Sequence, residues 1–261
     1  MALLEVEGLT VRYGGLTAVD SVDLKVEAGQ LVGLIGPNGA GKTTFVDAIT
    51  GLTPSSGTVR FDGARIDHLK PHLRTRKGLV RTFQSLELFD DLTVTENVRV
   101  AADACSPGGL PWVRTRDERE QTISRALHAL DLEHLADKRP TALSHGQRKL
   151  VGVARSLGAQ PKLLILDEPA GGLDVAESID FGDRLRRIVE TGIGGLLIDH
   201  DMGLIFRVCD YVFALEFGTV IAQGTPEHVR SDHRVITAYL GESAASIVEQ
   251  ELSSHPEGAS S

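Results

Sequence analysis

Apolar and polar residues alternate over residues 3–28, most clearly in VDLKVE at residues 22–27. A period of two residues is typical of a strand with one buried face and one exposed face, as in antiparallel sheets. Phe61, within GTVRFDG, fits the same small sheet. The pattern therefore predicts an N-terminal antiparallel β-subdomain.

Four later runs are short and apolar: LVGLIG, GLVRTF, KLLILDEP and GGLLIDHD. They are bounded by Gly, Pro or acidic residues, and helical patterns lie between them. Such runs are typical of buried parallel strands in an α/β domain. After them, YVFALEFGTVIAQGTP predicts a closing hairpin with Gly218 in its turn.

Between the second and third of these runs the apolar residues take the helical period, with Ile123, Leu127 and Leu130 at i, i+4 and i+7. This predicts a helical subdomain over about residues 86–158, with a loop at residues 106–116. We expect residues 1–241 to form one domain that contains this subdomain. Residues 242–261 have few large apolar groups, which predicts a disordered tail.

Composition narrows the classes of function. The chain has 261 residues, 41% of them hydrophobic and 24% charged, and can bury a full core. Its net charge of -9 argues against binding to a nucleic acid, because proteins that bind the phosphate backbone of DNA or RNA usually carry a basic face. Apolar runs fall well short of the roughly 18 residues of a membrane-spanning helix. Any role at a membrane is therefore expected to depend on a partner protein.

Residues 36–43, GPNGAGKT, fit the phosphate-loop pattern Gly-x4-Gly-Lys-Ser/Thr without a gap. They follow an apolar strand and open a helical pattern, as such a loop requires. Glycines permit the turn that points backbone amides at phosphate oxygens, Lys42 meets the β and γ phosphates, and Thr43 offers a hydroxyl to Mg²⁺. The other residues expected at the nucleotide are Asn38, Gly39, Ala40, Gly41 and Thr44.

Asp167 and Glu168 end the apolar run KLLILDEP. The carboxyl end of a parallel strand brings side chains to the ligand crevice. There Asp167 can join the coordination shell of Mg²⁺, and Glu168 can orient or deprotonate an attacking water. Adjacent carboxylates at a strand end are often solvated turn residues, but a phosphate loop in the same chain favours the catalytic interpretation.

LSHGQ, residues 143–147, allows two interpretations. Ser144 followed by Gln147 is a capping box, which opens many helices. Ser144 and Gly146 could instead form a second phosphate-binding helix start, about twenty residues before the acidic pair. One active site needs only one such helix start, so the second interpretation makes sense if LSHGQ serves another active site.

Together, these motifs resemble those of the ATP-binding subunits of ABC transporters, in the family's order and over nearly the whole chain. The resemblance rests on GPNGAGKTT, Gln84 after RTF, LSHGQ, LLILDEPAGGLD, and His200 in LLIDHD. It implies an α/β phosphate-loop ATPase with a mixed, largely parallel core sheet. It also implies two subunits that face each other head to tail, so that Ser144, Gly146 and Gln147 of one close over ATP held by the other.

The resemblance also implies roles for residues that would otherwise be read as ordinary structure. Tyr13 would stack on adenine, and Gln84 would sense Mg²⁺ and the attacking water. Asp174 would couple the two sites, and His200 would hold the γ-phosphate. Without the resemblance, Tyr13 is a strand aromatic, Gln84 a surface amide and His200 a core histidine at a strand end.

A transport ATPase is favoured over an ABC protein that acts on ribosomes or DNA, because the chain has one set of motifs and a negative net charge. GLVRTFQSLELFDDLTVTENV and VITAYLG most resemble the ATPases of branched-chain (hydrophobic) amino-acid uptake systems. This implies integral-membrane permease subunits, a second ATPase subunit that is identical or not, and, indirectly, a substrate-binding protein. It places the chain at the cytoplasmic face of the membrane.

Two related ATPases stay open as alternatives, those of urea or amide uptake and those of lipopolysaccharide export. His145 differs from the Gly or Tyr common in the signature, and LSHGQ is reminiscent of the urea-type subunits. Asp174 stands where the amino-acid group often has Asn. An ATPase subunit does not contact the cargo, so its residues do not identify the substrate.

Apolar residues follow Gln84, and a small subdomain has little room to bury all of them. We expect Leu86, Leu88 and Phe89 to form a groove in which the permease docks, since grooves that receive partner helices are typically apolar. A local hydrophobic cluster is the alternative.

Overall fold

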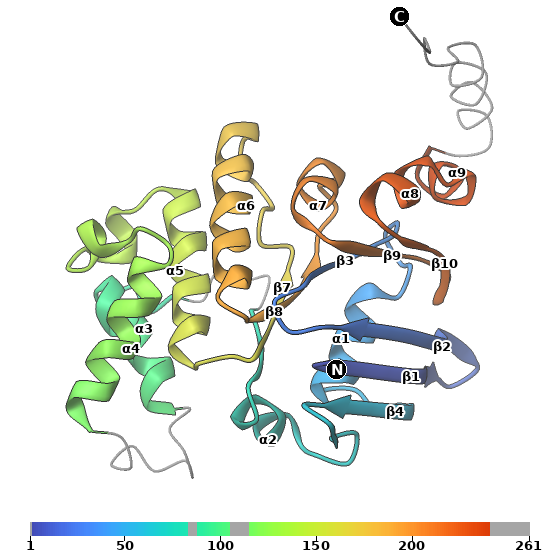
Figure 1. Ribbon diagram of the computed structural model, residues 1–261, viewed down its shortest axis with the longest axis horizontal. Coiled ribbons are helices and arrows are strands. Elements are labelled where there is room, and N and C mark those ends of the chain that lie inside the picture. The colour runs from blue at the N-terminus through green and yellow to red at the C-terminus, as the bar shows by residue number, and fades with distance from the viewer. Residues whose placement is uncertain (1, 83–87, 105–114, 241–261) are drawn as a thin grey trace, which may run out of the picture.

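The computed structural model of the protein describes residues 2–82, 88–104 and 115–240 (Figure 1). These residues form two sheets, of four and six strands, and the helices that cover them. None of the helices in the described ranges is long and apolar enough to cross a membrane.

The smaller sheet has the strand order β2-β1-β4-β5 and is antiparallel throughout. Its strands are β1 (Leu4–Tyr13), β2 (Leu16–Val26), β4 (Ser56–Phe61) and β5 (Ala64–Arg65). In the second half of β2 buried and exposed residues alternate, and Phe61 pairs with Leu4 of β1. The predicted N-terminal antiparallel subdomain, with Phe61 in it, is confirmed.

The larger sheet has the order β10-β9-β3-β8-β7-β6. Its strands are β3 (Leu31–Ile35), β6 (Leu79–Arg81), β7 (Leu163–Asp167), β8 (Gly194–Ile198), β9 (Tyr211–Glu216) and β10 (Thr219–Gly224). All neighbours are parallel except β9 and β10, which form the predicted hairpin with Gly218 in its turn. The four apolar runs are β3, β6, β7 and β8, as predicted.

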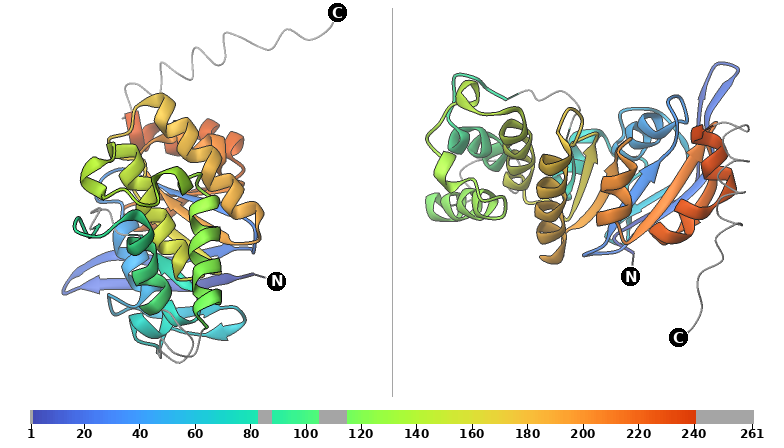
Figure 2. Two further views of the ribbon diagram at one scale, coloured as in Figure 1. Left: turned by 90° about the vertical axis from the view of Figure 1, so that its left-hand side faces the viewer. Right: turned by 90° about the horizontal axis from the view of Figure 1, so that it is seen from above.

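Helices cover the larger sheet on one face, and α1 and the smaller sheet lie on the other (Figures 1 and 2). The helices are α1 (Lys42–Thr50), α2 (Pro71–Arg76), α3 (Val94–Ala104), α4 (Arg116–His128), α5 (His145–Gly158), α6 (Val175–Glu190), α7 (Met202–Val208), α8 (Pro226–Ser231) and α9 (His233–Leu240). In β7, Leu163 and Ile165 pack toward α1, whereas Leu164 and Leu166 pack toward the covering helices. Because both faces of β7 are covered, an uninterrupted apolar run is what this strand needs.

Helices α3, α4 and α5 pack on one another, to the left in Figure 1. Ile123, Leu127 and Leu130 are buried there, as their helical spacing predicted. The predicted loop at 106–116 is one residue too long at its end, because the capping box of Thr115 and Glu118 starts α4 at Arg116. Residues 106–114 of that loop, and the predicted tail, lie outside the described residues.

Candidate functional site

The phosphate loop connects β3 to α1, and two of its glycines are required by close contacts. Gly41, the N-cap of α1, has φ +101°, and a Cβ there would lie 2.5 Å from the Ala18 carbonyl oxygen. At Gly36 a Cβ would lie 2.2 Å from the Leu215 carbonyl oxygen. The loop is therefore wedged between β2 and β9, with no room for a side chain at either position.

Lys42 folds back over this loop. Its Nζ donates to the carbonyl oxygen of Gly36 at 2.6 Å and to that of Pro37 at 3.1 Å. Burial lowers the pKa of Lys42, and the carboxylates of Glu168 and Asp167 partly oppose this effect. The ammonium group is thus a partly desolvated cation next to the acidic pair.

A cavity of about 310 Å³ brings the predicted phosphate-loop residues together with Glu168. Its lining is Leu16, Thr17, Ala18, Asn38, Gly39, Ala40, Gly41, Lys42, Thr43, Thr44, Glu168 and Phe217. Tyr13, at the end of β1, does not line this cavity and is 51% exposed. Its stacking on adenine stays a prediction.

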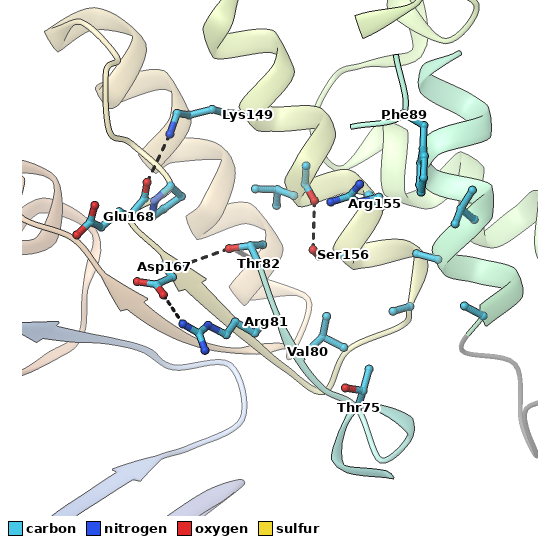
Figure 3. Close-up of a pocket in the computed structure, with 17 residues that line it drawn as sticks. Thr75, Val80, Arg81, Thr82, Phe89, Lys149, Arg155, Ser156, Asp167 and Glu168 are labelled. Carbon is cyan, nitrogen blue, oxygen red and sulfur yellow. Dashed lines mark hydrogen bonds and ion pairs between the residues drawn. The ribbon is translucent and has the colours of Figure 1, made fainter. Parts of the chain in front are cut away.

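Asp167, the last residue of β7, is buried and held by an arginine that sequence analysis missed. Arg81 donates to Asp167 Oδ2 at 2.6 Å and, through its other terminal nitrogen, to Asp47 Oδ1 of α1 at 2.5 Å. The backbone amide of Asp167 also donates to the Thr82 hydroxyl (Figure 3). Through Arg81, the carboxylate is thus connected to α1, the helix that follows the phosphate loop.

Glu168 has φ +47°, a left-handed conformation that is uncommon for a residue other than glycine. Its amide donates to the Ile198 carbonyl oxygen at 2.7 Å, and its own carbonyl accepts from Lys149 Nζ at 3.4 Å (Figure 3). Burial lowers the pKa of Lys149, and Asp199 and Glu168 oppose this effect. A non-glycine residue in a left-handed conformation, with hydrogen bonds to both its amide and its carbonyl, is typical of a turn at a functional site.

At the end of the neighbouring strand β8, Asp199 ties two segments together. This buried carboxylate accepts from the amides of His200 at 2.8 Å and of Ala170 at 3.1 Å, so it joins the end of β8 to the turn after Glu168. The His200 side chain is 65% exposed and lies 3.5 Å from Asp199. It is not a core histidine, and its contact with a γ-phosphate stays a prediction.

Ser144 is the N-cap of α5, and the predicted capping box is present. Its hydroxyl accepts from the Gln147 amide at 3.2 Å, and the Gln147 side chain accepts from the Ser144 amide at 3.1 Å. Ser144, Gly146 and Gln147 line a separate hollow of about 230 Å³, beside Glu177 of α6. LSHGQ therefore lies apart from the phosphate-loop cavity of its own chain.

Asp174 caps α6 in the same manner, with Glu177 as its capping-box partner. His145 Nε2 lies 3.4 Å from the Gly171 carbonyl oxygen, so the unusual signature residue contacts the turn that leads to Asp174. Gln84, the last of the residues predicted for this machinery, lies outside the described residues.

A groove of about 330 Å³ runs from the acidic pair to the helices α3 and α5 (Figure 3). Phe89, Val100 and Val153 are among its apolar lining residues, and Asp167 and Glu168 lie at its other end. Leu88 is buried in the core instead, and Leu86 lies outside the described residues.

A second contact missed by sequence analysis comes from the end of the described chain. The Tyr239 hydroxyl, on α9, accepts from the amide of Gly36 at 2.6 Å. Burial raises the pKa of Tyr239 to about 12, so this hydroxyl stays protonated at neutral pH. The first residue of the phosphate loop is thus bound to the last described helix.

Known proteins are similar to this chain in both sequence and fold. The ABC transporter family matches residues 19–171, and the family described as branched-chain amino acid ATP-binding cassette transporter matches residues 219–245. The high-affinity branched-chain amino acid transport ATP-binding protein BraF of Pseudomonas aeruginosa is 41% identical over 251 residues, which cover 92% of this chain and 98% of BraF.

Two solved cassettes extend the comparison. The ADP conformation of MJ1267, an ATP-binding cassette of an ABC transporter, has a TM-score of 0.83 at 31% identity and covers 93% of this chain and 100% of its own. The dimeric structure of MJ0796, a bacterial ABC transporter cassette, has a TM-score of 0.72 at 26% identity, with coverages of 85% and 98%. The predicted fold and ATPase activity are confirmed: the chain belongs to the ABC transporter family, as an ATP-binding protein that hydrolyses ATP to drive transport.

Proposed function

We propose that this chain is the ATPase subunit of an importer for branched-chain or other amino acids, with ATP and Mg²⁺ as cofactors. The observation that carries the proposal is the single cavity shared by the phosphate loop and Glu168. The amino-acid class rests on the similarity to BraF, since the cargo does not touch this subunit.

The residues around the cavity fit the requirements of phosphoryl transfer, which depends on positioning and charge neutralisation. The start of α1 and Lys42 would hold the phosphates. Thr43 and Asp167 supply hard oxygen donors of the kind that Mg²⁺ prefers, and Gln84 would join them. Bound there, Mg²⁺ would neutralise charge on the phosphate oxygens. Glu168 would take the proton of the attacking water.

A head-to-tail pair of ATPase subunits accounts for the position of LSHGQ. Ser144, Gly146 and Gln147 line a hollow separate from their own phosphate-loop cavity, so their contact with ATP requires a partner subunit. The dimeric MJ0796 cassette supports such a pair. Asp174, at the start of α6, would then couple the two sites, and the exposed His200 would hold the γ-phosphate.

Replacement of Glu168 by Gln tests this function. Removing a general base typically slows a reaction about 100-fold or more, while phosphate binding is retained. We therefore expect E168Q to lose turnover and to accumulate as an ATP-bound dimer on a sizing column. E190Q, at the far end of α6, is the matched control and should keep turnover. An E168Q protein that stays monomeric with saturating ATP would contradict the composite site.

The groove around Phe89 is the proposed docking site for an integral-membrane permease at the cytoplasmic face of the membrane. Its connection to Asp167 and Glu168 would let docking influence hydrolysis. We expect F89D to bind ATP normally but to lose its permeases when the tagged chain is recovered from detergent-solubilised native membranes. L52D charges an apolar residue of similar exposure that does not line the groove, and it should retain them.

The same purification tests the transport system. Two permeases and a second ATPase subunit are the expected partners, and a genetically linked substrate-binding protein could then be titrated with leucine, isoleucine and valine. Recovery of ribosomal proteins or DNA-repair factors with no membrane subunit would contradict the proposed importer, although the ATPase assignment would stand.

A further inference from the structure

Residues 168–174 form a turn that leads from the end of β7 to the N-cap of α6. The Gly171 amide donates to the Glu168 carbonyl oxygen at 3.3 Å, which closes the first part of this turn. Glu168 and Gly172 have φ values of +47° and +78°, so the turn contains two left-handed residues. The direction of the Glu168 side chain therefore depends on how the turn is held.

Two side chains reach this turn from one face of α5. His145 and Lys149 are four residues apart, so they are neighbours on the surface of the helix. His145 Nε2 lies 3.4 Å from the Gly171 carbonyl oxygen, to which the tautomer with a hydrogen on Nε2 donates. Lys149 Nζ donates to the Glu168 carbonyl oxygen at 3.4 Å (Figure 3). Both ends of the hydrogen-bonded part of the turn are thus bound to the same helix.

The Lys149 contact uses a buried charge. Only 7% of this residue is exposed, and burying an ammonium group is costly unless it is paired. The Asp199 and Glu168 carboxylates favour its charged form. Asp199 also accepts from the Ala170 amide at 3.1 Å, so it holds the same turn from the end of β8. The chain therefore keeps a cation at the Glu168 carbonyl, where an apolar side chain would be easier to bury.

The His145 contact is separate from the cap of α5. Ser144 and Gln147 form the whole capping box, so the helix start does not need an imidazole. A Cβ at Gly172 would lie 3.2 Å from His145 Nε2, which places the imidazole directly against the turn. A glycine at position 145 would have no group to reach the Gly171 carbonyl.

We propose that His145 and Lys149 are positioning residues for Glu168 of their own chain, because they hold residues 168–174 against α5. This rests on the proposed function, in which Glu168 takes the proton of the attacking water and Ser144 contacts ATP held by the partner subunit. Helix α5 would then serve two active sites. Its cap would serve the partner's site, whereas His145 and Lys149 would serve the site of their own chain.

Two measurements separate this role from a contact with the partner's ATP. One is kcat and KM for ATP of the full-length chain, and the other is ATP-dependent dimer formation on a sizing column in the E168Q background. Loss of one hydrogen bond predicts that H145A lowers kcat about fivefold, with KM and the ATP concentration that the dimer requires unchanged. H145Q, whose amide can donate to Gly171, should restore kcat. H72A, at an exposed histidine of α2, is the matched control and should behave as the wild type.

Loss of the charged contact should have a larger effect. K149M keeps an unbranched side chain without the charge and should lower kcat about 20-fold, because hydrogen bonds of charged groups are stronger than neutral ones. K149R keeps a charged donor and should lose much less. Thermal unfolding of each variant identifies a loss of kcat that comes from lost stability alone, and the comparison of H145A with H145Q does not require K149M to fold.

Each contrary result has its own meaning. If H145A raises the ATP concentration that the E168Q dimer requires, His145 contacts the partner subunit or its ATP, and the proposal is wrong. Unchanged kcat in H145A, or an equal loss in H145A and H145Q, would also overturn the role of His145. If E168Q itself stays monomeric with saturating ATP, the composite site fails instead, whereas the kcat values of H145A and H145Q still test the positioning of Glu168.

Discussion

Two helices in this protein begin beside predicted phosphate contacts, and they begin differently. Among the described residues, no side chain caps α1, whose N-cap is the left-handed Gly41. The start of α5 is closed by the full capping box of Ser144 and Gln147. Amide donors at a helix start need partners, which can be side chains, water or a ligand.

Under the proposed function, this difference would distinguish a site for the chain's own ATP from one that contacts ATP held by the partner subunit. With no side-chain cap, the first-turn amides of α1 are available to the phosphates that this chain is proposed to bind. In α5 the exposed Ser144 accepts from the Gln147 amide, so this helix start is capped without a ligand. The Ser144 hydroxyl accepts within the box, and its proton is still able to donate to a phosphate.

The largest expected effect on ATP binding comes from adding a side chain at Gly41, the N-cap of α1. In G41A the methyl group would overlap the Ala18 carbonyl oxygen, and the φ of +101° would be strained. A strain and overlap of this kind should weaken ATP binding about 100-fold in calorimetry. G192A is the matched control, because φ there is +98°, no atom lies within 4 Å of the added Cβ, and the residue does not line the phosphate-loop cavity. Normal ATP affinity in G41A would mean that the start of α1 does not bind phosphate.

Removing the capping box of α5 should have a smaller effect, on stability and turnover instead of ATP binding. We expect S144A to lower the free energy of unfolding by about 1 kcal/mol, as lost caps do, to slow turnover several-fold, and to leave ATP binding by the monomer unchanged. T115A removes the same kind of capping box from α4 and should lose similar stability without slowing turnover. If S144A weakened ATP binding in the monomer, LSHGQ would belong to its own chain's site.

The smallest effect on ATP binding is expected at Gly36, the first residue of the phosphate loop, whose amide already donates to the Tyr239 hydroxyl. Y239F removes the acceptor for the Gly36 amide, a hydrogen bond with a net contribution of about 1 kcal/mol. ATP affinity should fall only about threefold, because the other amides of the loop are unaffected. Y211F, which removes a hydroxyl from β9, should bind ATP normally. A loss in Y239F as large as that in G41A would show that the loop depends on α9.

Local patterns predicted most of the fold. Alternation in VDLKVE identified the antiparallel sheet, and the uninterrupted apolar run in β7 identified a strand covered on both faces. Glycine spacing identified the phosphate loop, and Ser144 with Gln147 identified a capping box. These predictions succeeded because each pattern describes geometry within a few residues of chain.

The contacts between distant segments could not be predicted in this way. Arg81 connects Asp47 to Asp167, and Tyr239 binds Gly36 across 203 positions. The residues next to Arg81 and Tyr239 in the sequence do not predict these hydrogen-bond partners. The partners come into contact only through the tertiary packing of β6 and α9.

The sequence by itself identified the antiparallel strands, the four buried strands and the closing hairpin, and it identified the phosphate loop, the acidic pair and the cap of α5. Backbone periodicity and hydrogen bonding within a few residues are local, so the order of residues is enough to specify them. Only the tertiary structure decided that Glu168 and Phe217 share a cavity with the phosphate loop while Ser144 does not. That division depends on how strands far apart in the chain pair in one sheet, and such pairing is set by burial of both sheet faces over the whole core.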